Sequence, residues 1–364
     1  MIFMRNLIVF MIAVLLFSCS GGNGKSVAIN EISIIDGFPS EVSLEEIDLN
    51  CDEIGLNSIK VVDSLLIVGH DAHWSILNSR DGKKYGDCLG VGQGPGEFNV
   101  LPRSASSLFI SEGDSLVAYI PDKNKGRIMR FNLSGFLGGM KEPISVALES
   151  DMLNNSCWEA IPCGPSSFLV SVANDSFTGF RRRILHDGEE VDHVMFSSLD
   201  TVCVNDEENI NLLAKVTRYN PASDRFVEGM LYLNQLNIYS TDGKWGKTVC
   251  VGKELDNLSD VESTMKVMRK NAYISMSAFD EGFGAIYSGF SDMDIYSGKG
   301  TGSEIQFFDW DGNPVCRTRL PYSVLAFDVD IPGGRIYAID EKEDRLRVYD
   351  AKKLSRLYGQ KQSR

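Results

Sequence analysis

Residues Val324–Asp350 read VLAFDVDIPGGRIYAIDEKEDRLRVYD and contain three short apolar runs separated by polar turns. The runs Val324–Val329, Arg335–Asp340 and Leu346–Asp350 are rich in β-branched and aromatic residues, and each has the length of a strand. The intervening segments carry Pro, Gly and Asp, which favour turns. This stretch therefore predicts three consecutive strands of one small sheet.

The same arrangement recurs along the whole chain. A short apolar strand followed by a polar-Gly turn occurs at Ile76-Leu77 with Asp81-Gly82, Phe131-Asn132-Leu133 with Ser134-Gly135, Ile184-Leu185 with Asp187-Gly188, Ile238-Tyr239 with Asp242-Gly243, and Phe307-Phe308 with Asp311-Gly312. These turns are spaced roughly 50–70 residues apart, as in repeat architectures. Each Asp-Gly provides the positive φ that a tight hairpin turn requires. Two further strands precede each copy, for example Ser58–Val62 with Leu65–Gly69 and Ser106–Ile110 with Leu116–Ile120.

Six such units of about four strands predict an all-β fold, a six-bladed β-propeller that spans residues 41–358. The last unit has only three strands, so we expect Glu41–Leu49 (EVSLEEIDL) to add its outermost strand and close the ring. Residues 359–364 are expected to form a polar tail. Leu255–Lys270 is the one segment whose apolar spacing suggests a short helix. An array of two β-sandwich domains is the alternative fold.

The first residues have the features of an export signal. Arg5 precedes an apolar run, Leu7–Phe17, that is too short to span a bilayer. Residues 1–18 are therefore expected to be a cleaved signal peptide. The sequence Leu16-Phe17-Ser18-Cys19 resembles a bacterial lipobox, whose cysteine carries fatty acyl chains such as palmitate after cleavage. Residues 19–40 would then hold the lipidated Cys19 and a flexible tether, and a plain signal peptide with an incidental cysteine is the alternative.

By resemblance to lipoprotein sorting rules, Ser20 after Cys19 favours the outer membrane, with the protein facing the periplasm.

The chain contains 50 acidic and 36 basic residues, a net charge of −14. Such a surface repels phosphate backbones, so we expect no nucleic-acid partner. Seven cysteines follow Cys19, an odd number, so at least one is unpaired in a monomer.

A glycine-rich loop follows the first predicted unit. It comprises Gly92, Gly94, Pro95, Gly96, Glu97 and Phe98. No Lys-Ser/Thr pair and no helix pattern follows, so it does not match a phosphate-binding loop. The loop is similar to that of the TolB-like six-bladed propeller lipoproteins, which are relatives of the NHL-repeat proteins. This resemblance covers nearly the whole mature chain and implies a structural crossing between blades, without implying an activity.

No motif in the sequence identifies a reaction. His70 and His73 are not expected to converge, because strand or loop residues at this spacing diverge, and no metal site is predicted. Calcium is conceivable at axial carboxylates, but no calcium-binding motif supports it, and no cofactor is predicted. The acidic pairs Asp292-x-Asp294 and Asp340–Asp344 are interpreted as solvated turns.

The first strand of each unit lines the channel of a propeller. The polar residues expected there are Lys60, Ser107, Glu159, Lys215, Ser275 and Asp328. Of these, Lys60, Glu159, Lys215 and Asp328 could bind a polar or zwitterionic ligand, or they could simply balance one another in a solvated channel. The sequence thus favours a non-catalytic envelope lipoprotein that binds a protein partner or a small polar ligand. A metal-dependent propeller hydrolase or lyase is the alternative.

The lipid anchor gives the first testable prediction. Replacing Cys19 with Ala removes the only acceptor for acylation in the lipobox, so the protein should appear in the soluble fraction or remain unprocessed. Membrane fractionation and mass measurement of the mature N-terminus check this. Normal membrane retention of the variant would show that Cys19 is incidental, and Cys51→Ser serves as the matched control.

Overall fold

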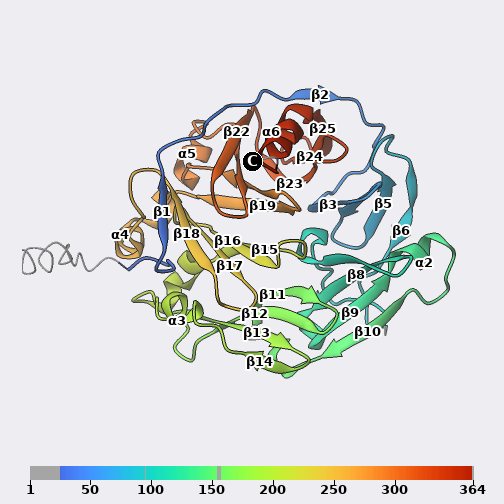
Figure 1. Ribbon diagram of the computed structural model, residues 1–364, viewed down its shortest axis with the longest axis horizontal. Helices are drawn as coiled ribbons and strands as arrows, with labels where there is room; N and C mark the ends of the chain where they lie inside the picture. Colours follow the sequence, from blue (N-terminus) through green and yellow to red (C-terminus); the bar gives the residue numbers. More distant parts are fainter. Residues whose placement is uncertain (1–24, 95, 154–156, 363–364) are drawn as a thin grey trace, which may run out of the picture.

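The computed structural model describes residues 25–94, 96–153 and 157–362. Six small, mainly antiparallel sheets stand in a ring around a central axis (Figure 1). This confirms the predicted six-bladed propeller. The expected signal peptide and Cys19 lie outside the described residues.

Consecutive hairpins build the blades from the axis outward. Blade one contains β3 (Ser58–Val62), β4 (Leu65–Gly69), β5 (Trp74–Asn78) and β6 (Lys84–Cys88); blade two contains β7 (Leu108–Glu112), β8 (Ser115–Asp122), β9 (Arg127–Asn132) and β10 (Ile144–Glu149); blade three contains β11 (Cys157–Gly164), β12 (Ser167–Ala173), β13 (Phe180–His186) and β14 (Glu189–Val191). Blade four contains β15 (Lys215–Asn220), β16 (Arg225–Met230), β17 (Gln235–Ser240) and β18 (Gly246–Val251); blade five contains β19 (Tyr273–Phe279), β20 (Gly282–Tyr287), β21 (Ser303–Asp309) and β22 (Pro314–Leu320); blade six contains β23 (Val324–Asp330), β24 (Arg335–Asp340) and β25 (Arg345–Asp350).

Short helices occupy several connections. The α-helices are α2 (Leu133–Leu137), α3 (Phe196–Asp200), α4 (Leu258–Ser263), α5 (Asp292–Tyr296) and α6 (Lys352–Gln362). The 3-10 helices are η1 (Ser104–Ser106), η2 (Lys123–Lys125), η3 (Asp151–Leu153), η4 (Glu207–Leu213) and η5 (Lys266–Met268). No helix in the described part of the chain is long and apolar enough to cross a membrane.

The core is divided among the contacts between neighbouring blades. Every residue of β4 is buried because the strand is covered on both faces. Leu65 and Ile67 pack toward blade two, whereas Leu66 and Val68 pack toward blade six. Each of the six contacts between blades has its own apolar cluster of this kind. Covered sheets explain why the middle strands are continuous apolar runs rather than alternating ones.

The N-terminal segment closes the ring. β2 (Glu45–Ile47) pairs antiparallel with β25 and becomes the outermost strand of blade six. Ile47 joins the cluster between blades six and one. This is the closing strand that Glu41–Leu49 was expected to supply.

The same segment also contacts blades four and five. β1 (Ile32–Ile35) adds a parallel strand to β18 (Figure 1). Glu41 forms a bridge with Arg317 of blade five. Val27 and Ile29 are buried in the cluster between blades three and four. The expectation of a flexible tether over residues 19–40 is therefore wrong for residues 25–40, because Val27, Ile29 and Ile35 are buried against the propeller.

The turns follow the sequence with one exception. Gly82, Gly188, Gly243 and Gly312 adopt φ values of 74°, 84°, 68° and 75°. At Ser134-Gly135 the chain instead forms the short helix α2, because the Asn132 side chain accepts a hydrogen bond from the Gly135 N–H and caps the turn. The repeated motif of an apolar strand and a polar-Gly pair thus predicts where the chain turns but not the type of turn.

The chain end differs from the expected tail. Residues Lys352–Gln362 form α6, which packs on blades five and six through buried Leu354 and Tyr358. The Tyr358 hydroxyl donates to the Phe308 carbonyl oxygen at 3.0 Å. Within Leu255–Lys270 only α4 and the single turn η5 are helical, because the Asn257 side chain caps the start and Thr264 is already extended.

The glycine-rich loop connects β6 to β7, and Pro95 within it lies outside the described residues. The Glu97 carboxylate accepts from the Gly94 N–H at 2.7 Å, and Phe98 is fully buried between blades one and two. A Cβ atom on Gly92 would overlap the Glu97 carboxylate, so a side chain there would push it away from the Gly94 N–H. Gly96 is similarly restricted, since its Cβ would lie 2.7 Å from Ile144.

Closure leads to the second prediction. Replacing Glu41–Leu49 with a Gly/Ser linker of equal length removes β2 and the buried Val42 side chain but keeps the chain connected. We expect the free energy of unfolding to fall by about 3–5 kcal/mol, with a broader thermal transition. Glu45→Ala, an exposed change in the same strand, should leave the melting temperature nearly unchanged. A linker variant that melts cooperatively at the parent temperature would show that this strand does not close the ring.

Candidate functional site

A funnel opens at the centre of the ring, where the inner strands end. It has a volume of about 720 Å³, and its walls come from the ends of β3, β15, β19 and β23 and from the start of β7. Seven charged side chains line it: Lys60, Asp63, Arg80, Asp280, Glu281, Asp330 and Arg335. A hollow of this size is typical of small-molecule sites in proteins.

The base of the funnel contains an ion pair between blades one and six. The Lys60 Nζ lies 3.2 Å from Asp328 Oδ2 and 3.3 Å from the Ala278 carbonyl oxygen of blade five. Asp328 also accepts hydrogen bonds from the Val61 N–H at 2.6 Å and from the Ser277 hydroxyl. Asp328 is buried, and these contacts within the protein use most of the hydrogen-bond capacity of its carboxylate. Lys60 keeps a side-chain exposure of 22% and faces the funnel.

A narrow extension of about 30 Å³ continues from this base and contains Arg218 of β15. The Arg218 guanidinium donates to the Met276 carbonyl oxygen at 2.9 Å and to the Thr217 carbonyl oxygen at 2.8 Å. No ion pair between Arg218 and a carboxylate occurs among the described residues. Burial lowers the pKa of Arg218 to about 10, because Glu159 and Asp328 offset only part of the desolvation and Arg103 opposes them.

The charges at the base are therefore unbalanced. Two cations, Lys60 and Arg218, line the extension together with one carboxylate, that of Asp328. Asp328 already forms an ion pair with Lys60. Ser107 lines both the funnel and its extension, and its buried hydroxyl has no hydrogen-bond partner within the described chain. Two cations and one carboxylate thus line the same narrow space, and this combination suits an anionic group.

The rim of the funnel has the opposite character. Asp280 and Glu281 lie together in the turn after β19, and Asp330 ends β23. Burial raises the pKa of Glu281, and the neighbouring Asp280 raises it further. The Arg335 guanidinium is held by the carbonyl oxygens of Ser79 and Arg80 at 2.8 and 3.0 Å. The wall near blade five is therefore acidic, whereas the base is basic.

Two of the expected channel residues point elsewhere. The Lys215 side chain is only 1% exposed and donates to the Ser171 hydroxyl at 2.7 Å, with Glu159 at 3.6 Å. Glu159 accepts from the Thr217 N–H at 3.2 Å and from its hydroxyl. Neither side chain lines the funnel or its extension. The expectation that Lys215 and Glu159 face the axis is wrong, because they pair in the contact between blades three and four. Ser275 is also buried and lines neither the funnel nor its extension.

Lys215 belongs to a larger buried network in this contact. Arg182 and Glu228 form a two-pronged ion pair with Nε–Oε1 and Nη2–Oε2 distances of 2.9 Å, and Asp200 binds the other side of the guanidinium at 3.0 Å. The Tyr239 hydroxyl donates to Glu228 at 2.8 Å. Burial alone would raise the pKa of Glu228, but Arg182 and Lys215 outweigh it and hold the pKa below its usual value.

Sequence reasoning missed Arg218 because of the pleat. Side chains alternate along a strand, so Lys215 and Arg218, three positions apart, face opposite sides of β15. The prediction that Lys215 faces the channel therefore placed Arg218 on the opposite side of the strand, away from the channel. The register of β15 against its neighbours decides between them, and no local pattern reveals it.

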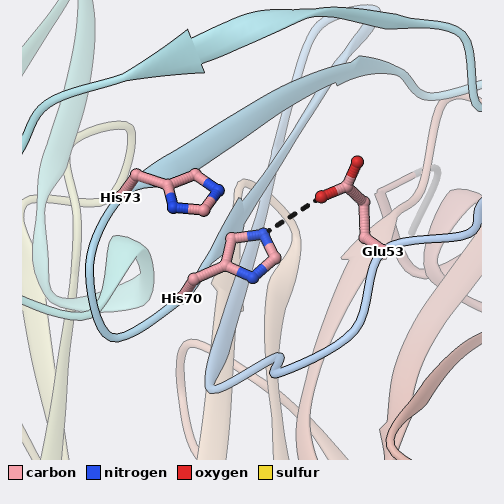
Figure 2. A group of neighbouring side chains, drawn as sticks. All are labelled: Glu53, His70 and His73. Carbon is pink, nitrogen blue, oxygen red and sulfur yellow. Dashed lines mark ion pairs between the residues drawn. The ribbon is translucent and has the colours of Figure 1, made fainter.

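His70 and His73 converge, contrary to expectation. The turn between β4 and β5 is sharp, so the two imidazoles stack with centroids 4.3 Å apart, and Glu53 lies against them (Figure 2). Burial lowers the pKa of His70, and His73 lowers it further. Gly69 pairs with Ser58 at the start of β3, whereas the funnel lies beyond the end of β3. The group therefore lies at the opposite end of blade one from the funnel.

Comparisons with known proteins identify the fold and no closer relationship. No protein-family model matches the chain, and no curated protein matches it. Among solved structures, a member of the DUF4221 family from Bacteroides vulgatus aligns with a TM-score of 0.53 and 11% identity over 86% of this chain and 98% of that one. A Bacteroides fragilis protein predicted to be exported aligns with a TM-score of 0.50 and 10% identity over 88% and 98%. At these identities the likeness supports the propeller fold.

The buried network gives the third prediction. Glu228→Gln leaves Arg182 and Lys215 with less compensating charge in a site closed to water. We expect a loss of about 3–5 kcal/mol in the free energy of unfolding, measured by denaturant titration. Glu190→Gln removes an exposed partner of Arg183 and should cost less than about 1 kcal/mol. Equal effects of the two changes would contradict a dominant buried pair.

Proposed function

We propose that this protein is an exported, lipid-anchored propeller whose funnel binds a small acidic or zwitterionic molecule without transforming it. The observation that carries this proposal is Arg218, a guanidinium at the base of the channel with no carboxylate partner among the described residues. The protein gives this guanidinium two carbonyl oxygens, and a ligand carboxylate would add the negatively charged acceptor. Charge-assisted hydrogen bonds of this kind are stronger than neutral ones.

The funnel also suits a second, cationic group. Lys60 and Arg218 lie at the base, whereas Asp280 and Glu281 lie on the rim. A molecule with a carboxylate at one end and an amine at the other would match both charges. The low-dielectric walls of Phe109, Phe279 and Ile331 strengthen these interactions relative to an open surface.

The location is inferred from the chain start. The apolar run Leu7–Phe17 and the lipobox-like Leu16–Cys19 support export and acylation at Cys19, and Ser20 favours the outer membrane on the periplasmic side. The predicted export of a Bacteroides fragilis protein of the same fold agrees with this inference. The membrane, reached through the acyl chains, and the small ligand are thus the proposed partners. The acidic surface disfavours nucleic acid.

Binding is preferred over the alternative of a metal-dependent hydrolase or lyase. Such an enzyme requires several metal ligands that converge at the axis. Within the described residues, the one set of three converging His, Cys, Asp or Glu ligand atoms is Glu53, His70 and His73, at the far end of blade one. The carboxylate at the base, Asp328, is instead engaged by Lys60, Val61 and Ser277.

A thermal-shift screen of dicarboxylates, amino acids and amino sugars tests the funnel, followed by calorimetry of each positive compound. Arg218→Gln and Lys60→Gln should each weaken binding by at least about tenfold, because each removes a charged donor. Lys83→Gln, an exposed change outside the funnel, should leave the affinity unchanged. Either of two results would overturn the proposal: no compound binds at millimolar concentration, or binding is indifferent to both substitutions.

A further inference from the structure

The group Glu53, His70 and His73 brings together two segments with separate roles. Glu53 lies on the chain that leads from the closing strand β2 to β3, and the histidines flank the β4–β5 turn (Figure 2). One potential ligand atom from each side chain lies within 4.8 Å of the others. Glu53 and His70 are largely buried, with side-chain exposures of 17% and 9%.

The surroundings of His70 fix the hydrogen on its ring. Nδ1 lies 2.9 Å from the Ile54 carbonyl oxygen, which only accepts, so Nδ1 carries the hydrogen. In the neutral ring Nε2 then presents a bare lone pair, and it points toward Glu53 Oε2 at 3.3 Å (Figure 2). A histidine whose other nitrogen donates to a backbone carbonyl is the usual arrangement of a metal ligand.

The group has fewer hydrogen-bond donors than its acceptors require. The Ser75 hydroxyl has one hydrogen, yet three acceptors surround its oxygen: Asp87 Oδ1 at 2.6 Å, Glu53 Oε2 at 3.0 Å and His70 Nε2 at 3.1 Å. The closest of these, Asp87, is the best placed to accept that hydrogen. With a neutral His70 ring, Glu53 Oε2 and His70 Nε2 then face each other as two lone pairs with no hydrogen between them.

Lys84 neutralises only the outer part of the group. Its Nζ contacts Glu53 Oε1 at 3.0 Å and Asp87 Oδ1 at 2.7 Å, and its side chain is 37% exposed. It contacts neither Glu53 Oε2 nor either imidazole among the interactions of the described residues. The inner side, formed by Oε2 and two imidazoles, thus has no cation of its own.

From this arrangement we propose that Glu53, His70 and His73 bind one divalent transition-metal ion, with zinc the best match to the ligand set. Two imidazole nitrogens and one carboxylate oxygen form a common three-residue zinc set, and a fourth position remains for water or for Asp87. Asp87 already lies 3.4 Å from His73 Nε2. Magnesium and calcium prefer oxygen ligands and fit the two imidazoles poorly.

The site would act on ring closure rather than on the funnel. Glu53 follows the closing strand, whereas both histidines belong to blade one, so a bound ion fastens the junction where the ring is joined. An ion that binds only the folded protein raises its stability by mass action. This function is independent of ligand binding at the other end of the blade.

The test uses the purified, metal-depleted full chain titrated with zinc chloride by calorimetry, with thermal melting in parallel. We expect one zinc ion per chain and a rise in melting temperature. His73→Ala, at a partly exposed position, should weaken zinc binding by at least about tenfold and abolish the rise while leaving the metal-free melting temperature nearly unchanged. His186→Ala changes an exposed histidine on β13 and should behave like the parent.

Two further variants test the identity of the ligands. Cys51→Ser should retain zinc binding, because the proposed set contains no thiolate, and Lys84→Met should bind zinc more tightly, because a competing positive charge is removed. The proposal is overturned if the parent does not bind zinc at millimolar concentration. It is equally overturned if His73→Ala binds zinc as tightly as the parent or if binding disappears in Cys51→Ser.

Discussion

The fold depends on burying both faces of every sheet against its neighbours. Each blade has two apolar faces, both covered by neighbouring blades, so the ring needs the sixth contact to bury the last two faces. That last contact joins residues from opposite ends of the chain, such as Leu66 and Val68 of blade one with Tyr337 and Ile339 of blade six. The strand β2 secures it by pairing with β25. The segment from β1 to β2 extends the closure, since it contacts blades four, five and six in turn.

The same ring brings the inner strands close enough for their polar side chains to interact. Lys60 and Asp328 come from the first and last blades and meet only because the ring is closed. Arg182 and Glu228 form an analogous pair between blades three and four, deep in the wall. The first pair lies at the base of an open funnel and the second is sealed from water. Burial therefore distinguishes Lys60, for which we propose a binding role, from Arg182, whose contacts are all within the protein.

The two proposed sites lie at opposite ends of blade one and differ in origin. The funnel is made mainly by the ends of inner strands and the turns that follow them, and five of the six blades contribute lining residues. The Glu53, His70 and His73 group instead lies where the closing segment meets the turn between β4 and β5. One site is thus a product of the ring as a whole, whereas the other is a product of its junction. Each site combines groups that no single blade contains.

The sequence by itself determined the number of blades and the closing strand. Asp-Gly turns at a regular spacing and middle strands with continuous apolar runs are local properties, and a missing strand in the last unit required one from the other end of the chain. The strands Ser58–Val62, Leu65–Gly69 and Arg335–Asp340 form at the expected residues. Of the expected channel residues, Lys60 and Asp328 meet at the funnel base. Only the tertiary structure decided that Lys215 turns into a blade contact while Arg218 faces the channel, because this depends on the pleat register between blades. It also decided that Glu53 meets His70 and His73. This contact depends on the shape of the β4–β5 turn and on the path of the segment before β3, and no local sequence pattern specifies either.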